Sequence, residues 1–296
     1  MSALVLAADV GGTQMRAALV GQDGAILERR AAPTPRHADV PEALVDLVRG
    51  VAAESSHGAA THAVVGLPGS IDYDAGRLLW APHLPPRWPD LLSADQLSAG
   101  LDLPVLVAND ADLAAVGEAL LGAGAASSDV AYITISTGIG AGVVHGGRLL
   151  RGGRSLAEIG HTVIDWGAWL AGSPSTLEEL GSGSGLAAQA RLAGLGDLDA
   201  PQVEAAAAAG DERARAIWDA AVAACAVGVA NVLMDFSPST VVIGGGLGRR
   251  EDFFQRVRDL VLDHPEHHPD DLAIVPSALG DDAGLVGTAR WLAAVG

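Results

Sequence analysis

Two glycine-rich turns, each directly after a short apolar run, are the residues of this sequence best suited to hold an anion. The first turn reads Asp9-Val-Gly11-Gly12-Thr13, and the second reads Thr137-Gly138-Ile-Gly140. Glycine lets the backbone approach a ligand closely, and consecutive N–H groups in a tight turn form an anion-binding concavity. The sequence contains no lysine. A triphosphate would therefore be held by these amides, by the hydroxyls of Thr13 and Thr137, by Arg16 if it points inward, and by Mg²⁺.

Two aspartates stand where a carboxylate could take part in such chemistry. Asp9, in the first turn, could hold Mg²⁺ directly or through water, or could only bond the backbone of its own turn. Asp110 opens an Ala-rich segment directly after an apolar run, where it could orient an alcohol and accept its proton. The alternative is that Asn109 and Asp110 simply cap a helix, a role that both residue types favour. Spacing alone leaves these roles open.

The elements that must position these residues follow one order twice. In the first half we expect strands at 4–10, 16–21, 25–30, 63–67 and 105–108, with helices at 41–54, capped by Asp39, and 109–121. In the second half we expect strands at 130–136, 141–145, 148–151, 240–243 and 273–276, with helices at 203–209, 213–234, 249–262 and 284–294. Residues 78–89 are expected to form an ordered loop.

The repeated order of three strands, a helix and a strand predicts an α/β protein with two similar lobes and a cleft between them. The predicted small lobe spans residues 1–108 and the large lobe spans residues 109–283. The closing helix, about 284–296, is expected to pack back on the small lobe.

A dinucleotide-binding fingerprint is the rival interpretation of the two glycine turns. That motif needs a strand followed by a glycine turn that opens a helix. Here residues 11–12 and 138–140 both lead into strand patterns, with a new turn signal about eight residues later. The spacing is too short for a crossover helix, so two facing hairpins are favoured.

Composition excludes several classes of function. The chain has 296 residues, of which 49% are hydrophobic and 18% charged, which is typical of a globular protein. Without lysine there is no Schiff base and no lysine-bearing P-loop. A net charge of -18 argues against non-specific binding to nucleic acid or to an anionic membrane.

The single cysteine and the start of the chain indicate a reducing compartment. Cys225 lies in an apolar run and has no partner for an intramolecular disulfide. The first residues lack the basic region of a signal peptide, and we expect no membrane span. The sequence therefore predicts a cytoplasmic protein.

Seven motifs in sequence order give the chain a recognisable pattern. They are Asp9-Val-Gly-Gly-Thr13, Gly66-Leu-Pro-Gly69, Asn109-Asp110-Ala-Asp112, Thr137-Gly-Ile-Gly140, Glu158-Ile-Gly-His161, Thr176-Leu-Glu178 and Gly244-Gly-Gly246. This set resembles the ROK sugar kinases, within the actin-like ATPase superfamily. The resemblance implies two ribonuclease-H-like lobes, each a β-β-β-α-β-α unit, and transfer of the γ-phosphoryl group of ATP to a hexose, usually at O6. It also implies Mg²⁺ and a homodimer.

The resemblance assigns a role to each motif. Asp110 is expected to be the general base. Sugar contacts are expected from Gly69, Asn109, Asp110, Glu158, His161 and Glu178. ATP contacts are expected from Asp9, Gly11, Gly12, Thr13, Thr137, Gly138, Gly140, Gly244, Gly245 and Gly246, and Asp9 is also the expected Mg²⁺ ligand.

The chain departs from the family pattern at several positions. Most members carry a cysteine-rich stretch after the Glu-x-Gly-His motif that binds structural zinc, whereas residues 166–176 contain no cysteine. We expect Trp166 and Trp169 to pack this loop in place of the metal, and Asp165 to orient the ring of His161. Gln14 replaces a usual lysine and His83 a common asparagine, and the histidines 264, 267 and 268 are expected to lie on the surface.

Glucose is the first expected substrate, with mannose, fructose, N-acetylglucosamine and N-acetylmannosamine as alternatives. Polyphosphate could also replace ATP as the donor. A second class is a sugar-sensing regulator, which some family members are, but those carry a winged helix domain before the first hairpin. A third is a sugar-binding protein with weak or no catalysis.

The first prediction is that the protein contains no structural zinc. Such a site needs four ligands in tetrahedral reach, and near His161 the sequence offers only carboxylates. Metal analysis of protein purified without a histidine tag should find far less than one zinc per chain, while EDTA should stop turnover and excess Mg²⁺ should restore it. Stoichiometric zinc that survives dialysis, with loss of fold on its removal, would contradict this prediction.

Overall fold

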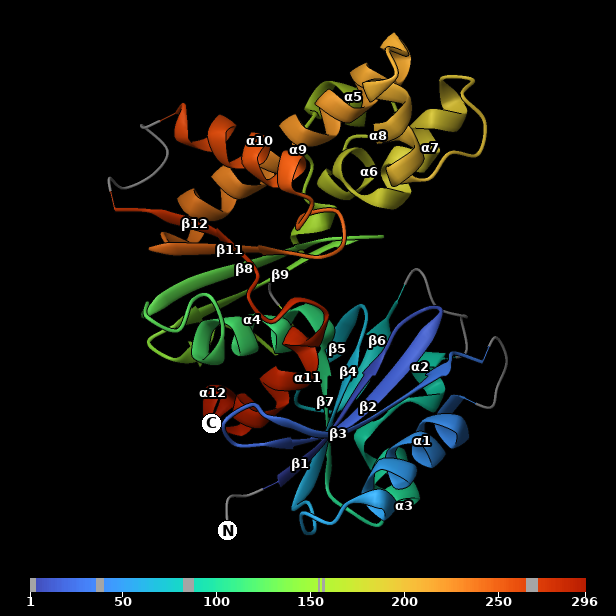
Figure 1. Cartoon of the computed structure of the whole chain (residues 1–296), viewed down its shortest axis with the longest axis vertical. Helices are drawn as coiled ribbons and strands as arrows, with labels where there is room; N and C mark the ends of the chain where they lie inside the picture. The colour runs from blue at the N-terminus through green and yellow to red at the C-terminus, as the bar shows by residue number, and fades with distance from the viewer. Residues whose placement is uncertain (1–3, 36–39, 82–87, 154, 156–157, 265–270) are drawn as a thin grey trace. The chain divides into compact units, whose positions relative to one another are not determined.

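The computed structural model describes residues 4–35, 40–81, 88–153, 155, 158–264 and 271–296 (Figure 1). Four residues singled out above, Asp39, His83, His267 and His268, lie outside the described residues. The chain divides into two compact units. The first consists of residues 1–128, 142–157 and 281–296, and the second of residues 129–141 and 158–280.

The first sheet has five strands in the order β3-β2-β1-β4-β7. They are β1 (Leu4–Val10), β2 (Gln14–Gly21), β3 (Ile26–Pro33), β4 (His62–Leu67) and β7 (Val105–Asn109). The first three form the expected antiparallel meander. β4 runs parallel to β1, and β7 runs parallel to β4. All the strands expected in this half are therefore present.

The second sheet repeats this order as β10-β9-β8-β11-β12. Its strands are β8 (Asp129–Ile135), β9 (Ile139–His145), β10 (Arg148–Leu149), β11 (Thr240–Gly244) and β12 (Ala273–Pro276). β11 is parallel to both β8 and β12, and all five of its residues are buried. A parallel strand covered on both faces is expected to be continuously apolar. The duplicated α/β architecture predicted from the sequence is confirmed.

The first sheet is covered on both faces, and this decides where its polar residues point. Side chains of a strand alternate between faces. The even-numbered residues of β1 join a core cluster with helix α1 (Val40–Glu54), whereas Ala7 joins a second cluster with Leu285 of α11 (Ala283–Gly287). Figure 1 shows α1 and α11 on opposite faces of the sheet. Alternation therefore places Asp9 on the α11 face.

The segment 78–89, expected to be an ordered loop, has regular structure at its two ends, and residues 82–87 lie outside the described residues. β5 (Ser70–Asp72) and β6 (Arg77–Trp80) form a hairpin, and α2 (Trp88–Leu91) and α3 (Ala94–Leu101) follow. Proline and tryptophan suggested a loop, but Leu78 is 2% exposed and Trp88 is also 2% exposed. Burial of these two side chains in the core cluster overrides the weak local propensity.

The closing helix expected at 284–294 is broken into three short pieces. These are α11, a 3₁₀ turn (η4, Thr288–Arg290) and α12 (Trp291–Val295). α11 lies against α4 (Asp110–Leu121), since a Cβ atom on Gly287 would collide with the carbonyl oxygen of Leu113. The end of the chain thus belongs to the first unit, with β1 and α4.

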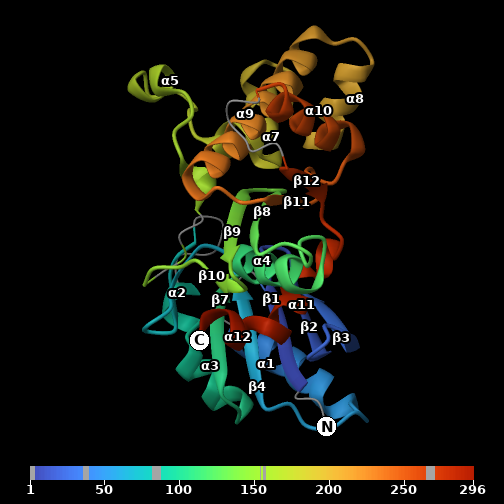
Figure 2. The same cartoon turned by 90° about the vertical axis from the view of Figure 1, so that its left-hand side faces the viewer.

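The second unit also contains helices. They are η1 (Ile159–His161), α5 (Trp166–Leu170), α6 (Leu177–Gly181), α7 (Gly183–Leu192), α8 (Ala200–Ala208), α9 (Glu212–Phe236) and α10 (Glu251–Leu262) (Figures 1 and 2). Among the described residues, α9 is the one helix long and apolar enough to cross a membrane, by length and composition alone. Of its apolar window, 61% is buried inside the structure. Cys225 of α9 is buried, and burial raises the pKa of its thiol.

The compact units and the predicted lobes divide the chain at different places. Residues 109–128, which include α4, group with the first sheet, whereas the predicted lobes assign them to the second. α4 packs its small residues against α11, and this contact explains the grouping. The lobe boundary at 108 stays a prediction.

We predict that Gly287→Ala destabilises the first unit because the new methyl group must push α11 away from the backbone of α4. Overpacking of this kind lowers the free energy of unfolding by roughly 1 to 3 kcal/mol. Gly284→Ala is the matched control on the same helix, since its nearest neighbour would be Asp110 O at 3.8 Å. Denaturant unfolding should show a loss for the first variant only. Equal midpoints for both variants would contradict the proposed close packing.

Candidate active site

The polar residues predicted for the site in the first unit gather at one edge of its sheet. Asp9 of β1 is in register with Gly66 of β4, and Leu67 of β4 is in register with Asn109 of β7. These three strands are parallel, so their carboxyl ends meet at the same edge. Ligands of open α/β sheets bind outside this edge. The first glycine turn, Gly69 and Asp110 all follow directly from these strand ends.

Asn109 is a buried cap that joins two of these strand ends. It is 4% exposed, and its Oδ1 accepts the N–H groups of Ala111 at 2.9 Å and Asp112 at 3.0 Å. Its Nδ2 donates to the carbonyl oxygen of Gly69 at 2.9 Å. Asn109 therefore caps helix α4, as one interpretation of the sequence proposed. The predicted contact of Asn109 with a sugar is not tested by these bonds.

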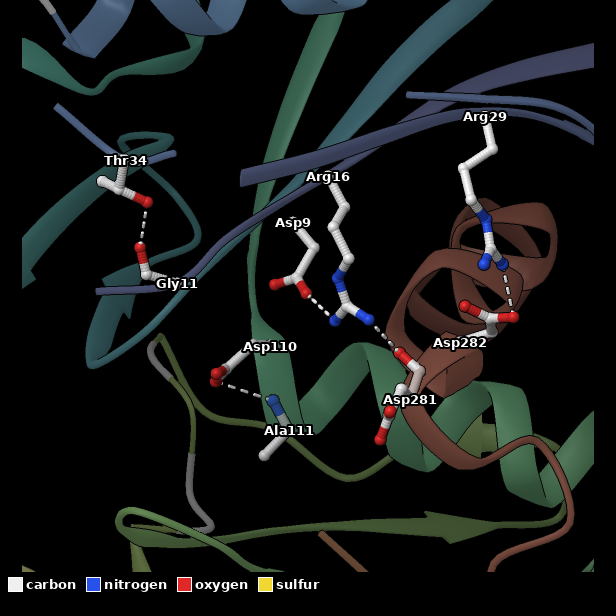
Figure 3. Close-up of polar contacts among 9 residues, drawn as sticks. All are labelled: Asp9, Gly11, Arg16, Arg29, Thr34, Asp110, Ala111, Asp281 and Asp282. Atoms are coloured by element: carbon white, nitrogen blue, oxygen red, sulfur yellow. Dashed lines mark hydrogen bonds and ion pairs between the residues drawn. The ribbon is translucent and has the colours of Figure 1, made fainter. Parts of the chain in front are cut away.

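Asp110 is the first residue of α4, directly after this cap. It is partly buried, and its Oδ1 accepts the N–H of Ala111 at 2.9 Å (Figure 3). The positive end of the helix dipole stabilises a carboxylate at this place. Asp110 thus lies at the edge of the sheet where β7 ends.

Asp9 and Arg16 form an ion pair on the α11 face of the sheet (Figure 3). The two residues are opposite one another in the β1–β2 hairpin. The second amino group of Arg16 donates to the carbonyl oxygen of Asp281 at 2.7 Å. A permanent cation therefore lies beside the carboxylate predicted to bind Mg²⁺. The sequence could name Arg16 as a candidate only on condition that it points inward.

The first glycine turn is held in place by its neighbours. Gly11 N donates to Gln14 O at 2.9 Å, while Thr34 donates its hydroxyl to Gly11 O at 2.7 Å and its N–H to Thr13 O at 3.0 Å. Thr34 is a buried residue. Gly12 and Thr13 are exposed, and a Cβ on Gly12 would meet nothing within 4 Å. The turn is rigid at its base and open at its tip.

Gly69 must be glycine for reasons of the fold. Its φ is +93°, a conformation that other residues rarely adopt. A Cβ atom there would also collide with the carbonyl oxygen of Trp80. Its own carbonyl oxygen accepts the Asn109 amide, so Gly69 is fixed next to the start of α4.

The second unit gathers its predicted site residues in the same way. β8 and β11 are adjacent and parallel, so Thr137 and the three glycines 244–246 follow strand ends at one edge. The N–H groups of Leu247 and Gly248 both donate to Ile135 O at 3.0 Å. A Cβ on Gly245 would collide with this same oxygen, whereas a Cβ on Gly246 would meet nothing within 4 Å. Close packing therefore requires glycine at position 245, whereas the backbone at Gly246 is not covered by neighbouring atoms.

Glu178 lies against the second glycine turn. Its Oε2 accepts the N–H of Ile139 at 2.8 Å, and a Cβ on Gly138 would stand 2.5 Å from the same oxygen. One amide of the turn is thus already bonded to a carboxylate. Thr137 is exposed and Gly140 is partly buried in β9. The start of α7 also holds the turn, since Ser184 N donates to Thr137 O at 3.1 Å.

Glu158, His161 and Glu178 form one electrostatic group. Glu158 Oε2 is 3.8 Å from His161 Nε2. Burial raises the pKa of Glu158, His161 opposes the rise, and the carboxylate of Glu178 adds to it. The two carboxylates predicted to bind a sugar are therefore close enough to influence each other.

Two expectations about the loop after His161 are wrong. Trp166 is 76% exposed and Trp169 is 59% exposed, so neither packs the loop against the rest of the unit. Figure 2 shows α5 projecting away from α8 and α10. Asp165 does not take the expected place beside His161; its side chain caps α5 by accepting the N–H of Ala168 at 2.8 Å. A five-residue helix has too few buried positions to hold two indole rings.

The metal expectations concern two different sites. Asp9 supplies a carboxylate oxygen, a ligand type that suits Mg²⁺. Among the described residues no group of three or more His, Cys, Asp or Glu side chains could hold a metal ion. The structure therefore offers no alternative ligand set around His161 in its described part.

Sequence reasoning gave no role to two residues near Asp110, Tyr73 and Asp112. Tyr73 donates its hydroxyl to Asp112 Oδ2 at 2.5 Å, and Asp112 is 1% exposed. A charged residue buried within an Ala-rich helix was the available signal, because buried carboxylates need partners.

Comparison with known proteins gives one consistent result. A family model described as "ROK family" matches residues 5–295. The chain is 38% identical over 296 residues to the bifunctional enzyme NanE/NanK of Brucella melitensis, covering 97% of this chain and 54% of that protein. It thus spans about half the length of that relative. An N-acetylmannosamine kinase of Shigella boydii is 36% identical, with 96% of each chain covered.

A solved structure from the ROK family also matches this chain. The ROK family glucokinase of Streptomyces griseus, in complex with glucose and AMPPNP, matches with a TM-score of 0.77 at 31% identity. The match covers 97% of this chain and 98% of that one.

We predict that Glu158→Gln raises thermal stability near neutral pH, because the variant removes a charge whose burial raises its pKa. A raised folded-state pKa means that the ionised form opposes folding. The gain should be full above the raised pKa and should disappear as the pH falls toward the ordinary glutamate range. Melting curves between pH 4 and 8 measure it, with Glu212→Gln on the exposed first turn of α9 as control. A gain that grows at low pH would contradict the sign.

Proposed function

We propose a function from one premise: the chain belongs to the ROK family, whose model matches residues 5–295. The proposed activity is transfer of the γ-phosphoryl group of ATP to a hydroxyl group of a hexose or N-acylhexosamine. The observation that carries this proposal is the position of Asp110, the first residue of α4, at the sheet edge that also holds Asp9. Phosphoryl transfer to an alcohol needs a base for the hydroxyl and charge stabilisation for the phosphates.

Asp110 acts as the general base in this proposal. It accepts the proton of the attacking hydroxyl while the new oxygen–phosphorus bond forms and the bond to ADP breaks. Base catalysis of this kind contributes about 10²- to 10⁴-fold to the rate. The helix start fixes the Asp110 backbone, because Asn109 bonds two amides of α4 and the Gly69 carbonyl.

The donor phosphates are assigned to the two glycine turns. Mg²⁺, when bound, neutralises charge on the β- and γ-phosphates, and Asp9 is the residue that would hold it, directly or through water. Arg16, already beside Asp9, adds a permanent positive charge in a chain that contains no lysine. The open tips at Gly12, Thr13 and Gly246 leave backbone groups accessible for the nucleotide.

The relatives bear on the choice of sugar. Glucose was the first expectation from sequence, and a glucokinase at 31% identity supports it. Relatives at 36% and 38% identity are named N-acetylmannosamine kinase and NanE/NanK. We therefore place N-acetylmannosamine first and glucose second, with O6 as the acceptor atom in both. Glu158, His161 and Glu178 supply the acceptors and the imidazole that sugar hydroxyls require.

Three further parts of the proposal rest on the sequence. The homodimer follows from the family resemblance, the cytoplasmic location from the single cysteine, and the absence of structural zinc from the lack of cysteine in residues 166–176.

We predict that Asp110→Asn lowers kcat by about 10²-fold or more, because an amide cannot accept the proton while its shape still fills the site. A coupled ADP-release assay over N-acetylmannosamine, glucose, mannose, fructose and N-acetylglucosamine identifies the substrate, and polyphosphate serves as an alternative donor. Sugar affinity, measured by calorimetry, should stay near the wild-type value.

Asp197→Asn is the matched control, since the Asp197 side chain is 89% exposed and pairs only loosely with Arg191 at 3.6 Å. A variant at Asp110 with nearly unchanged kcat would remove this residue from the base role. Absence of turnover with every sugar in the panel, despite sugar binding, would instead favour a binding protein without catalysis.

A further inference from the structure

The hydroxyl group of Tyr73 lies at the junction between β7 and α4. It donates to Asp112 Oδ2 at 2.5 Å and accepts the backbone N–H of Asn109 at 3.3 Å. Asn109 directly precedes Asp110, and Asp112 follows it by two residues. The phenol oxygen is therefore bonded on both sides of the proposed base.

Both partners of this bond are shielded from water. Asp112 is 1% exposed and Tyr73 is partly buried. Burial and the Asp112 carboxylate both raise the pKa of Tyr73, so the phenol keeps its proton and remains the donor. A hydrogen bond from a neutral donor to a buried carboxylate is short and strong, and its loss leaves a charge without that donor.

Tyr73 is itself held by two segments that are distant from it in sequence, residues 151–153 and Trp291. Its N–H donates to Gly153 O at 2.9 Å. The guanidinium carbon of Arg151 lies 5.1 Å from the centre of its ring, within the range of a cation–π interaction. The ring of Trp291 lies 5.8 Å away, tilted by 44°. These contacts fix the ring of Tyr73 and thereby the position of its phenol oxygen.

We propose that Tyr73 and Asp112 form a positioning pair for Asp110, fixing the start of α4 so that the base carboxylate keeps its direction toward the sugar hydroxyl. This inference rests on the proposed kinase function. Tyr73 and Asp112 touch neither the sugar nor the nucleotide in this proposal. Their effect is on the orientation of the base, so it falls on the chemical step and leaves sugar binding nearly unchanged.

The first variant is Tyr73→Phe, which removes one oxygen atom and keeps the ring between Arg151 and Trp291. We expect kcat to fall roughly 10-fold, because small misplacements of reacting groups have large effects on rate, while the KM for the sugar changes less than about 2-fold. Asp112→Asn should lose less than Asp112→Leu, since an amide oxygen still accepts the phenol proton.

The double variant Tyr73→Phe with Asp112→Asn tests the pair as a unit. Residues that share one hydrogen bond are not additive, so its loss in kcat should be close to that of the more impaired single variant. Losses in kcat that multiply would overturn the proposal of a pair.

Thr288→Val is the matched control for removing a buried hydroxyl. Thr288 is 1% exposed, lies in the same unit, and donates to Leu285 O at 2.6 Å away from this network. We expect it to lower the melting temperature, as Tyr73→Phe does, without lowering kcat. If both variants lower kcat in proportion to stability, the role of Tyr73 is general packing and the proposal is wrong.

A measurement independent of turnover separates this inference from the proposed function. Amide hydrogen exchange of Asn109, followed by NMR, should accelerate in Tyr73→Phe and not in Thr288→Val, because only the former loses the acceptor of this N–H. Unchanged exchange overturns the inference, and so does accelerated exchange with wild-type kcat. If the wild-type chain phosphorylates no sugar, the kinase proposal fails while exchange still decides whether Tyr73 fixes this residue.

Discussion

The amide side chain of Asn109 is the constraint on which the first half of the site depends. One buried group satisfies two N–H groups at the start of α4 and holds the carbonyl of Gly69, which follows the neighbouring strand. Backbone groups at a helix start need partners when they are buried. Because Asn109 supplies them from the end of β7, the strand cannot shift relative to the helix. This arrangement fixes the position of the Asp110 backbone.

The duplicated sheet explains why residues far apart in sequence come together in each unit. In both halves the central strand is followed by a glycine turn, and parallel neighbours bring their carboxyl ends to the same edge. The order of strands, the turns at 11–13 and 137–140, and the base candidate Asp110 could all be predicted from sequence. Apolar runs and glycine spacing are local patterns, so they can be recognised without any knowledge of tertiary contacts.

Other features depended on the tertiary structure and could not be predicted from local patterns. The hairpin of β5 and β6 forms because Leu78 is buried, although its surroundings in sequence suggested a loop. Trp166 and Trp169 have the composition of core residues, yet they lie exposed on a helix of five residues. Tyr73 reaches Asp112 across 39 positions of sequence. No pattern of spacing within a single sequence predicts a pair of this kind.

The carboxylates near the two sheet edges differ in how well their charge is balanced by hydrogen-bond donors or cations. Asp9 has the guanidinium of Arg16, Asp112 has the phenol of Tyr73, and Glu178 has the amide of Ile139. Glu158 stands apart, because its pKa is raised by burial and by Glu178 despite the nearby His161. A sugar hydroxyl donating to Glu158 would offset that unfavourable burial on binding. Natural proteins tolerate locally unfavourable groups at functional sites, and the sugar contact proposed for Glu158 is consistent with this rule.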